Sequence, residues 1–260
     1  SSGCDGVSMT PPGGGTGTGG WSSEEIHASD PLSYLRERLA DWTVWSPVPL
    51  PRFHGGAVGY LGFDCIRHFE DLPLAQGPGL GHPDARFLFA RDLYIYDHVS
   101  RRLTLVTHVP LDGDRSAAYA EGLARLDRAM ARLYDEPLAP GSPWALGADE
   151  LAQASVPDER RPPRRTNRSR EDFEDAVRRA RQAIEQGEIF QVVISQRLSV
   201  SVSVAPLELY RALRALNPSP YMFLLRFDDF AVVGASPAVL VRVDDGEILL
   251  VQRAESGLWL

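Results

Sequence analysis

Polar and apolar side chains alternate along residues Ile189–Val200, which read IFQVVISQRLSV. In an extended strand successive side chains point to opposite faces, so Gln191, Ser195 and Arg197 would share one face, opposite an apolar one. A face with an amide, a hydroxyl and a guanidinium could line a polar cavity, or it could simply meet water. The periodicity alone favours a strand that faces solvent.

A second stretch, LNPSPYMF (Leu216–Phe223), ends one helical pattern and begins an extended one. Pro218 and Pro220 forbid helix and remove two backbone N–H donors, so we expect a rigid corner around Ser219. Most corners of this kind only redirect the chain, whereas one followed by Tyr-Met-Phe could also present a binding surface. The spacing by itself favours the simple corner.

Other patterns that could carry chemistry are weak. No Ser-His-Asp order, carboxylate pair or metal-ligand cluster stands out, and Cys4 and Cys65 are too few for a disulfide framework. The net charge of −8 argues against general binding to nucleic acid or to an anionic membrane. Six arginines between Arg160 and Arg170 lack interleaved aromatic residues, which favours a solvated linker over a nucleic-acid site.

The composition also bears on location. The chain is 43% hydrophobic, yet it has no apolar run long enough to span a bilayer and no secretory signal pattern at its start. We therefore expect a cytoplasmic protein without a membrane or nucleic-acid partner. Three of the six histidines, His54, His98 and His108, lie where core or turn histidines commonly do.

The elements that must position these residues fall into two regions. Residues 1–29 begin with Gly, Ser and Thr, and we expect a disordered leader there. The first region, 30–136, opens with an Asp30-Pro31 helix start and continues through a glycine-dense strand, two further strands and a long helix. That helix carries an apolar stripe that should face the core: Tyr119, Leu123, Leu126, Met130 and Leu133. Residues 137–168 are rich in Pro, Gly and Arg and are interpreted as a linker.

The second region spans residues 169–250. Local signals delimit its elements: a capping box at Ser169 and Asp172, a helix stop at Gly187, a helix start at Pro206, and hairpin turns at Asp228-Asp229 and Asp245-Gly246. Helices combined with runs of tight hairpins favour an α+β fold, with antiparallel sheets backed by helices, over a doubly wound parallel sheet. Residues 251–260 match no expected element.

Five segments, in order, resemble the large subunit (component I) of anthranilate synthase, a chorismate-utilising lyase. They are FHGGAVGYLGFDCIRHFEDLP, DLYIYDHVSRRLTLVTH, SREDFEDAVRRARQAIEQGEIFQVVISQR, LYRALRALNPSPYMFLLRF and VVGASPAVLVRVDDG. The resemblance runs from Asp30 to Glu247. It implies part of that family's fold and the conversion of chorismate and ammonia to anthranilate and pyruvate, the first committed step of tryptophan biosynthesis. It also implies a glutamine amidotransferase subunit (component II) that supplies ammonia, and Mg²⁺ that holds the carboxylates of the substrate.

In that family the proline corner contributes to the allosteric site for tryptophan, the end product. The resemblance implies that Pro220, Tyr221 and Met222 contact the effector. Asn217 and Phe223 would shape the pocket. A proline-stiffened wall loses little entropy when a ligand binds, and methionine and aromatic faces suit an indole ring.

The resemblance also places Gln191 in the wall of the chorismate cavity. Related enzymes that add water to chorismate, such as isochorismate and salicylate synthases, carry a lysine there as the base that activates the water. A glutamine amide cannot take up that proton, so an ammonia-using enzyme is indicated. The alternative is aminodeoxychorismate synthase component I of the folate pathway, which uses ammonia but usually departs from PSPYMF.

Three departures from the family pattern matter. The upstream strand with the Leu-Glu-Ser half of the tryptophan pocket has no counterpart in residues 1–20, and Ala238 stands where the family has a proton-transferring glutamate. After Leu250 the chain does not resemble the C-terminal half, which holds the catalytic histidine, the Mg²⁺ ligands and the chorismate-binding arginine. We therefore expect an inactive fragment, with a non-catalytic tryptophan-sensing remnant as the alternative.

Overall fold

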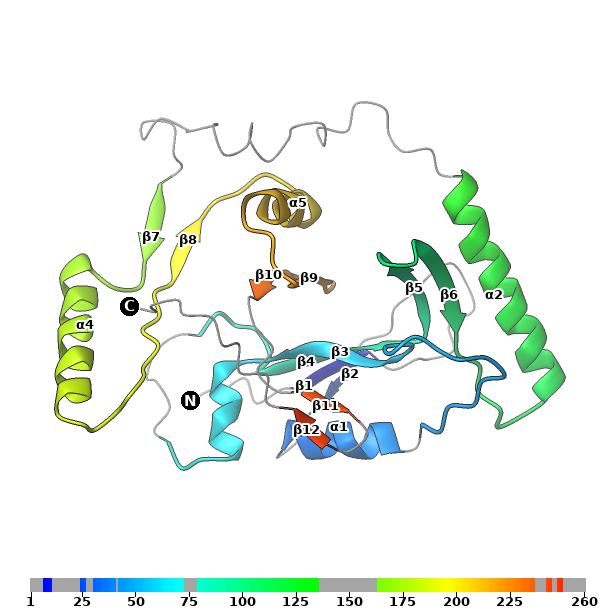
Figure 1. The fold of residues 1–260 in the computed structure, drawn as a ribbon, viewed down its shortest axis with the longest axis horizontal. Coiled ribbons are helices and arrows are strands. Elements are labelled where there is room, and N and C mark those ends of the chain that lie inside the picture. The colour runs from blue at the N-terminus through cyan, green and yellow to red at the C-terminus, as the bar shows by residue number, and fades with distance from the viewer. Residues whose placement is uncertain are drawn as a thin grey trace. The chain divides into compact units, whose positions relative to one another are not determined.

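The computed structural model describes residues 7–10, 24–26, 30–40, 42–72, 79–135, 163–236, 242–244 and 247–249. The chain divides into two units, Ser1–Ala139 and Pro140–Leu260 (Figure 1). This division falls within the expected linker 137–168, most of which lies outside the described residues, as does the tail 251–260. The α+β class with helices beside antiparallel sheets is confirmed, with one parallel strand pair as an exception.

The described part of the first unit holds a four-stranded sheet, a two-stranded ribbon and three helices. In chain order the elements are β1 (Val7–Thr10), β2 (Glu24–Ile26), α1 (Pro31–Ala40), β3 (Gly56–Leu61), the 3₁₀ helix η1 (Phe63–His68), β4 (Ala85–Ala90), β5 (Asp92–Asp97), β6 (Arg102–Thr107) and α2 (Arg115–Asp135). The sheet has the order β2-β1-β4-β3, in which β1 runs parallel to β4 and the other pairs are antiparallel. Strands β1 and β2 lie within residues 1–29, where we expected a leader without structure.

The core of this unit lies between α1 and β4. Alternate side chains of β4, Ala85, Phe87 and Phe89, are at most 7% exposed and form a buried cluster with Cys65. Several half-buried residues pack against this cluster: Tyr34, Leu35, Leu39, Trp42 and Ala57. The sheet is tight at Gly59, where a Cβ atom would lie 2.0 Å from the carbonyl oxygen of Arg86. The glycine at this position of the strand therefore permits a close approach of the two backbones.

Helix α2 packs against the β5–β6 ribbon through small residues and one arginine. A Cβ atom at Gly122 would lie 2.7 Å from Cγ1 of Val109, and the hydroxyl of Tyr94 donates to the carbonyl oxygen of Ala129 at 2.9 Å. The expectation that the apolar stripe of this helix faces the core was wrong. Its members are largely exposed: Tyr119 64%, Leu123 45%, Met130 47% and Leu133 47%. The helix instead docks on the side that permits the closest approach of backbones.

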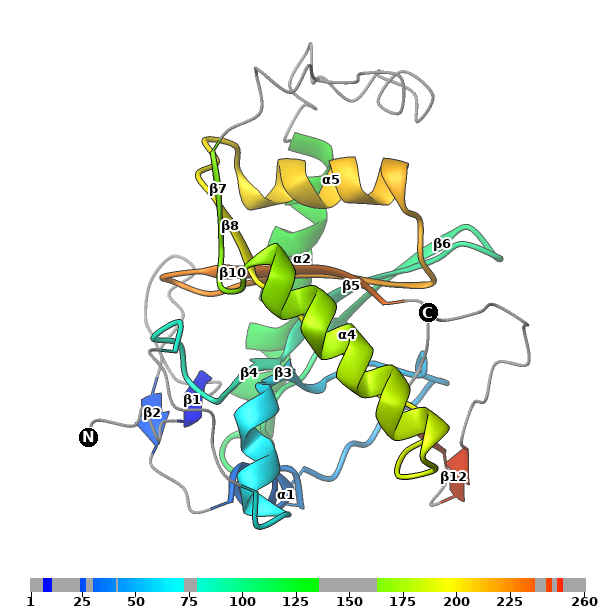
Figure 2. The ribbon, with the colours of Figure 1, turned by 90° about the vertical axis from the view of Figure 1, so that its left-hand side faces the viewer.

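The second unit is built from two-stranded antiparallel ribbons and two described helices. Its elements are β7 (Arg164–Thr166), α4 (Arg170–Glu185), β8 (Leu198–Val200), α5 (Pro206–Leu216), β9 (Tyr221–Arg226), β10 (Ala231–Ser236), β11 (Arg242–Asp244) and β12 (Glu247–Leu249). The pairs are β7–β8, β9–β10 and β11–β12. Helix α5 packs along the β9–β10 ribbon (Figure 2).

Local signals position these elements as the sequence predicts. The hydroxyl of Ser169 accepts the N–H of Asp172 at 3.0 Å, and the Asp172 carboxylate accepts the N–H of Ser169 at 3.4 Å, which is the expected capping box. Gly187 has a φ of +75° after the last turn of α4, a conformation that glycine adopts without strain. Pro206 is the first residue of α5, and Phe227 donates to Phe230 across the Asp228-Asp229 turn at 2.8 Å.

Candidate functional site

The proline corner connects α5 to the β9–β10 ribbon. Helix α5 ends at Leu216, and the N–H of Asn217 still donates to the carbonyl oxygen of Leu213 at 2.8 Å. The chain then turns through residues 218–220 and enters β9 at Tyr221. The two prolines explain this sharp stop, because neither can continue the hydrogen-bond ladder of the helix.

A serine hydroxyl ties the corner to the neighbouring strand. The Ser219 hydroxyl donates to the backbone oxygen of Ser236, the last residue of β10. The same oxygen atom of Ser219 accepts the N–H of Tyr221 at 3.3 Å. The corner is therefore fixed both to the first residue of β9 and to the last residue of β10.

Beyond the corner, the register of the ribbon sorts the aromatic residues onto one face. Tyr221 pairs with Ser236, Met222 with Ala235 and Phe223 with Gly234. Directly paired residues share a face and successive residues alternate. Tyr221 and Phe223 thus lie together and are 45% and 39% exposed, whereas Met222 is half-buried on the opposite face.

Gly234 brings the Phe223 ring down onto the ribbon. A Cβ atom at position 234 would lie 2.2 Å from Cζ of Phe223, so the ring occupies the space that any side chain there would need. Since α5 packs on this ribbon and Tyr221 and Phe223 remain exposed, the helix covers the Met222 face. The other face is an open aromatic surface next to a rigid corner, a shape that suits a flat apolar ligand.

The predicted site residues are distributed accordingly. Asn217 at the end of α5, Pro220 in the corner, and Tyr221 with Phe223 lie around one end of the ribbon. Met222 lies on the other face, so a single ligand could reach its side chain only at the ribbon edge. The position of the missing glutamate, Ala238, lies outside the described residues.

The segment that carries Gln191 differs from its predicted form. Only Leu198–Val200 is a strand, paired with Arg164–Thr166, and residues 191–197 form neither helix nor strand. Gln191, Ser195 and Arg197 are all exposed, and the apolar Phe190 and Val193 are 98% and 84% exposed. The predicted strand over Ile189–Val200 was therefore wrong for most of its length. Alternation shows which residues could share a face, but a strand also needs a partner to accept its backbone hydrogen bonds.

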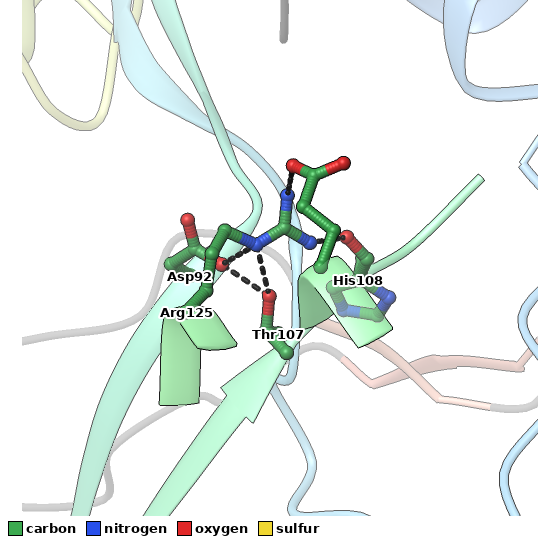
Figure 3. Close-up of polar contacts among 5 residues, drawn as sticks. Asp92, Thr107, His108 and Arg125 are labelled. Carbon is green, nitrogen blue, oxygen red and sulfur yellow. Dashed lines mark hydrogen bonds and ion pairs between the residues drawn. The ribbon is translucent and has the colours of Figure 1, made fainter. Parts of the chain in front are cut away.

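A polar cluster in the described part of the first unit surrounds Arg125 (Figure 3). This side chain is 10% exposed and donates to Thr107 Oγ1 at 3.0 Å, Glu121 Oε1 at 3.0 Å and the carbonyl oxygen of His108 at 2.7 Å. Its Nε also lies 3.5 Å from the Asp92 carboxylate. Arginine only donates and stays charged, and here each of its three guanidinium nitrogens already has an acceptor. The cluster therefore fastens α2 to β6.

The three histidines singled out in the sequence have structural surroundings. The Nε2 atom of His108 lies 2.6 Å from the carbonyl oxygen of His54, and the two ring centroids are 5.6 Å apart. His98 lies in the turn after β5, with its ring edge-on to Tyr96 at 4.9 Å. The prediction of a turn histidine is confirmed for His98, whereas His54 and His108 are half-buried, with His108 beside Trp42.

The described residues do not fit a bound Mg²⁺. No group of three or more His, Cys, Asp or Glu side chains comes close enough among them to hold a metal ion. Mg²⁺ prefers oxygen ligands and commonly takes one or two carboxylates from the protein, with water and substrate oxygens completing its shell. None of the described helices is long and apolar enough to cross a lipid bilayer.

Sequence reasoning overlooked Ser219 and Gly234. A hydroxyl between two residues that have no N–H is a signal for a side-chain hydrogen bond, and this signal could have identified Ser219. Gly234 was not singled out, although a glycine inside a strand commonly marks close packing by a neighbour.

The fold and the site together define the class of this protein: an α+β protein in which a proline corner leads into a two-stranded ribbon with exposed aromatic residues. The chain belongs to the family of chorismate binding enzymes, whose model matches residues 17–251. It is 40% identical over 229 residues to anthranilate synthase component 1 of Pseudomonas aeruginosa, which covers 87% of this chain and 44% of the relative. It is 44% identical over 222 residues to the protein of that name from Streptomyces coelicolor, which covers 85% and 42% respectively.

A solved structure is similar over the same extent. The crystal structure of anthranilate synthase component I from Streptococcus pneumoniae matches with a TM-score of 0.65 at 26% identity, over 88% of this chain and 48% of that chain. This chain therefore spans about half the length of the relatives that it matches.

Proposed function

We propose that this chain is part of a component I of anthranilate synthase, which converts chorismate and ammonia to anthranilate and pyruvate in tryptophan biosynthesis. The observation that carries the proposal is PSPYMF at the corner of an open aromatic ribbon, in a chain of the chorismate binding family. Relatives that carry this enzyme name at 40% and 44% identity support it. Because this chain spans about half the length of those relatives, we propose the activity for a complete component I.

Ammonia is the proposed nucleophile, and a glutamine amidotransferase subunit is its proposed source. The support is Gln191, at the position where water-adding relatives carry a lysine. An amide cannot act as a base at neutral pH, so it cannot activate water for attack on chorismate. Its part in this proposal is to line the chorismate cavity.

Tryptophan is the proposed effector, held at the corner. The aromatic faces of Tyr221 and Phe223 offer a stacking surface for an indole, and Pro220 with Asn217 would form the rigid wall beside it. Met222 would add contact at the ribbon edge. With only part of the family's pocket in this chain, we expect a Kd weaker than about 1 μM in titration calorimetry. Micromolar or tighter binding that Met222→Ala abolishes would contradict the expected weak binding, and no binding at millimolar tryptophan would contradict the effector site.

The 260-residue chain by itself is proposed to be inactive. Mg²⁺ is expected for the family, but the described residues hold no ligand set for it, and Ala238 cannot transfer a proton as a glutamate would. A lost general acid or base alone costs roughly 10²–10⁴-fold in rate.

The test measures anthranilate fluorescence with chorismate, Mg²⁺ and excess ammonium, which bypasses the amidotransferase. The purified chain should give no more product than a control without protein. Adding the part of the Streptomyces coelicolor relative that lies beyond the matched 222 residues should permit substrate binding. In that mixture Ala238→Glu should raise the rate roughly 10²-fold or more, and in the chain alone it should recover nothing. Steady anthranilate formation by the unmodified chain would overturn the proposed inactivity.

The same mixture separates the two ammonia-using alternatives. Anthranilate synthase releases pyruvate, whereas aminodeoxychorismate synthase component I leaves the enolpyruvyl group on its product. Chromatography that finds aminodeoxychorismate without pyruvate would favour the folate pathway. If no product forms but tryptophan still binds at the corner, a non-catalytic sensing remnant is favoured.

A further inference from the structure

Ser219 is the one residue of the Pro-Ser-Pro corner that can donate a hydrogen bond. Pro218 and Pro220 have no N–H, so residues 218–220 offer only the N–H and hydroxyl of Ser219 as donors. The side chain is half-buried, and its hydroxyl joins the corner to the last residue of β10. The same hydroxyl accepts the N–H of the first residue of β9, Tyr221, at 3.3 Å.

The ribbon itself does not hold the corner in place. The β9–β10 register ends with the pair Tyr221 and Ser236, and residues 218–220 lie beyond it. The hydrogen bond from the corner to β10 comes from the Ser219 side chain. In sequence, Ser236 directly precedes Pro237 and Ala238, the position of the family's proton-transferring residue.

We infer that Ser219 is a positioning residue that transmits a change at the corner to the end of β10. The inference rests on the proposed function, since the corner is the proposed tryptophan-binding wall. A ligand against Pro220 and Tyr221 shifts or stiffens the corner. The Ser219 hydroxyl then carries that restraint to the Ser236 backbone, across the ribbon from Tyr221. Proline stiffness on both sides makes the serine move with the corner as one body.

The first test needs no ligand. Hydrogen–deuterium exchange followed by mass spectrometry compares peptides that cover the start of β9, the end of β10 and helix α4. In Ser219→Ala we expect exchange at the start of β9 and at the end of β10 to be about fivefold faster, which is the effect of losing one neutral hydrogen bond. Exchange in α4 should be unchanged. Ser219→Thr keeps a hydroxyl and should restore the slow exchange. Ser201→Ala, at an exposed position outside the ribbon, is the matched control and should behave as the unmodified chain.

Two results would overturn the inference. One is unchanged exchange at the end of β10 in Ser219→Ala, and the other is an equal effect from Ser201→Ala. If Ser219→Ala also loosens α4 and so unfolds the unit, Ser219→Cys provides a folded comparison. A thiol is a weak donor, so its exchange should lie between those of the unmodified chain and Ser219→Ala.

The second test adds L-tryptophan at millimolar concentration and separates this inference from the proposed function. In the unmodified chain exchange should slow both at the start of β9 and at the end of β10. In Ser219→Ala it should slow only at the corner and the start of β9. Equal slowing at the start of β9 and at the end of β10 in Ser219→Ala would overturn the transmission through this hydroxyl. No slowing at the corner of the unmodified chain would overturn the proposed effector site, while the ligand-free comparison still decides the role of Ser219.

Discussion

Two helices pack on two-stranded ribbons in this protein, and they are fastened by different chemistry. Helix α2 approaches the β5–β6 ribbon closely at Gly122 and is anchored by Arg125, whose donors reach two side chains of opposite or neutral charge and one backbone oxygen. Helix α5 packs on the β9–β10 ribbon, and the Ser219 hydroxyl holds the connection between them. The α2 contact is held by an arginine with several acceptors, whereas the connection between α5 and its ribbon is held by one serine hydroxyl next to the exposed Tyr221 and Phe223.

This difference shows that a well-connected polar cluster can serve attachment alone, without being the candidate ligand site. An arginine cluster invites interpretation as an active site, but each nitrogen of Arg125 already binds an acceptor within the first unit. The β9–β10 ribbon has fewer polar groups, and its exposed aromatic residues, Tyr221 and Phe223, lie next to a proline-stiffened corner. Tyr94 and Tyr96 of the β5–β6 ribbon are exposed to a similar extent, but they lie beside the arginine attachment of α2. The candidate site is therefore assigned to the less connected of the two.

The largest expected effect comes from removing the anchor of α2. Arg125→Ala removes the cation beside Asp92 and Glu121 and the donor to the carbonyl oxygen of His108, although Asp92 still accepts the Thr107 hydroxyl. We expect a loss of about 2–4 kcal/mol in the unfolding free energy of the first unit, measured by urea denaturation. Arg128→Ala, at an exposed position of the same helix, should cost less than about 0.5 kcal/mol. Equal losses from the two variants would remove the distinction drawn for Arg125.

A smaller effect is expected from filling the space under Phe223. Gly234→Ala places a methyl group where the ring now lies, so the ring must move at a cost of about 1–2 kcal/mol. In a Phe223→Ala background the same change should cost nothing, because the obstacle is gone. A double-mutant cycle measures this coupling. Gly113→Ala, with nothing within 4 Å, is the control. A cost that persists without the ring would mean that the glycine is needed for another reason.

The turn of the β5–β6 ribbon offers a gain. Arg101 has a φ of +53°, a conformation that strains any residue with a Cβ atom. Arg101→Gly should therefore raise the unfolding free energy of the first unit by about 0.5–1 kcal/mol. The neighbouring Arg102→Gly, inside β6, should lower it by a similar amount, because glycine weakens a strand. If both variants shift stability in the same direction, the strain at Arg101 is not real.

The smallest effect concerns the thiol of Cys65. Burial raises its pKa above the ordinary value of 9.0, with the nearby Asp84 carboxylate acting in the same direction. Because the folded state favours the neutral thiol, this contribution to stability is complete below the ordinary thiol pKa and is lost as pH rises through the folded pKa. In a Cys4→Ser background, thiol labelling should be slow at pH 8 and accelerate above about pH 9 or on unfolding. Rapid labelling of the folded chain at pH 8 would show that this unit opens more easily than its packing indicates.

Local signals in the sequence predicted much of the fold, and tertiary choices limited the rest. The caps at Asp30 and Ser169 and the stop at Gly187 depend on neighbouring residues, so the sequence alone sufficed. The side on which α2 docks could not be predicted in this way. Periodicity finds the widest apolar stripe, but Gly122 permits a closer approach on another side.

The candidate site was predictable as a location but not as an arrangement. The prolines indicated a corner before Tyr221, and the structure has one. Which aromatic residues share a face depends on the strand register, and the bond from Ser219 depends on a residue 17 positions away. The strand expected around Gln191 failed because alternation says nothing about whether a partner strand is present.

The parallel pairing of β1 with β4 has a consequence for the handling of this protein. It joins residues 7–10 to residues 85–88, across more than seventy positions. Without β1, the strand that carries Phe87 and Phe89 would become the sheet edge, with a row of unpaired N–H and C=O groups beside its apolar face. Such an edge recruits strands from other molecules, and self-association follows. A version shortened at its N-terminus to begin at residue 30 should therefore precipitate at concentrations at which the longer chain stays dispersed.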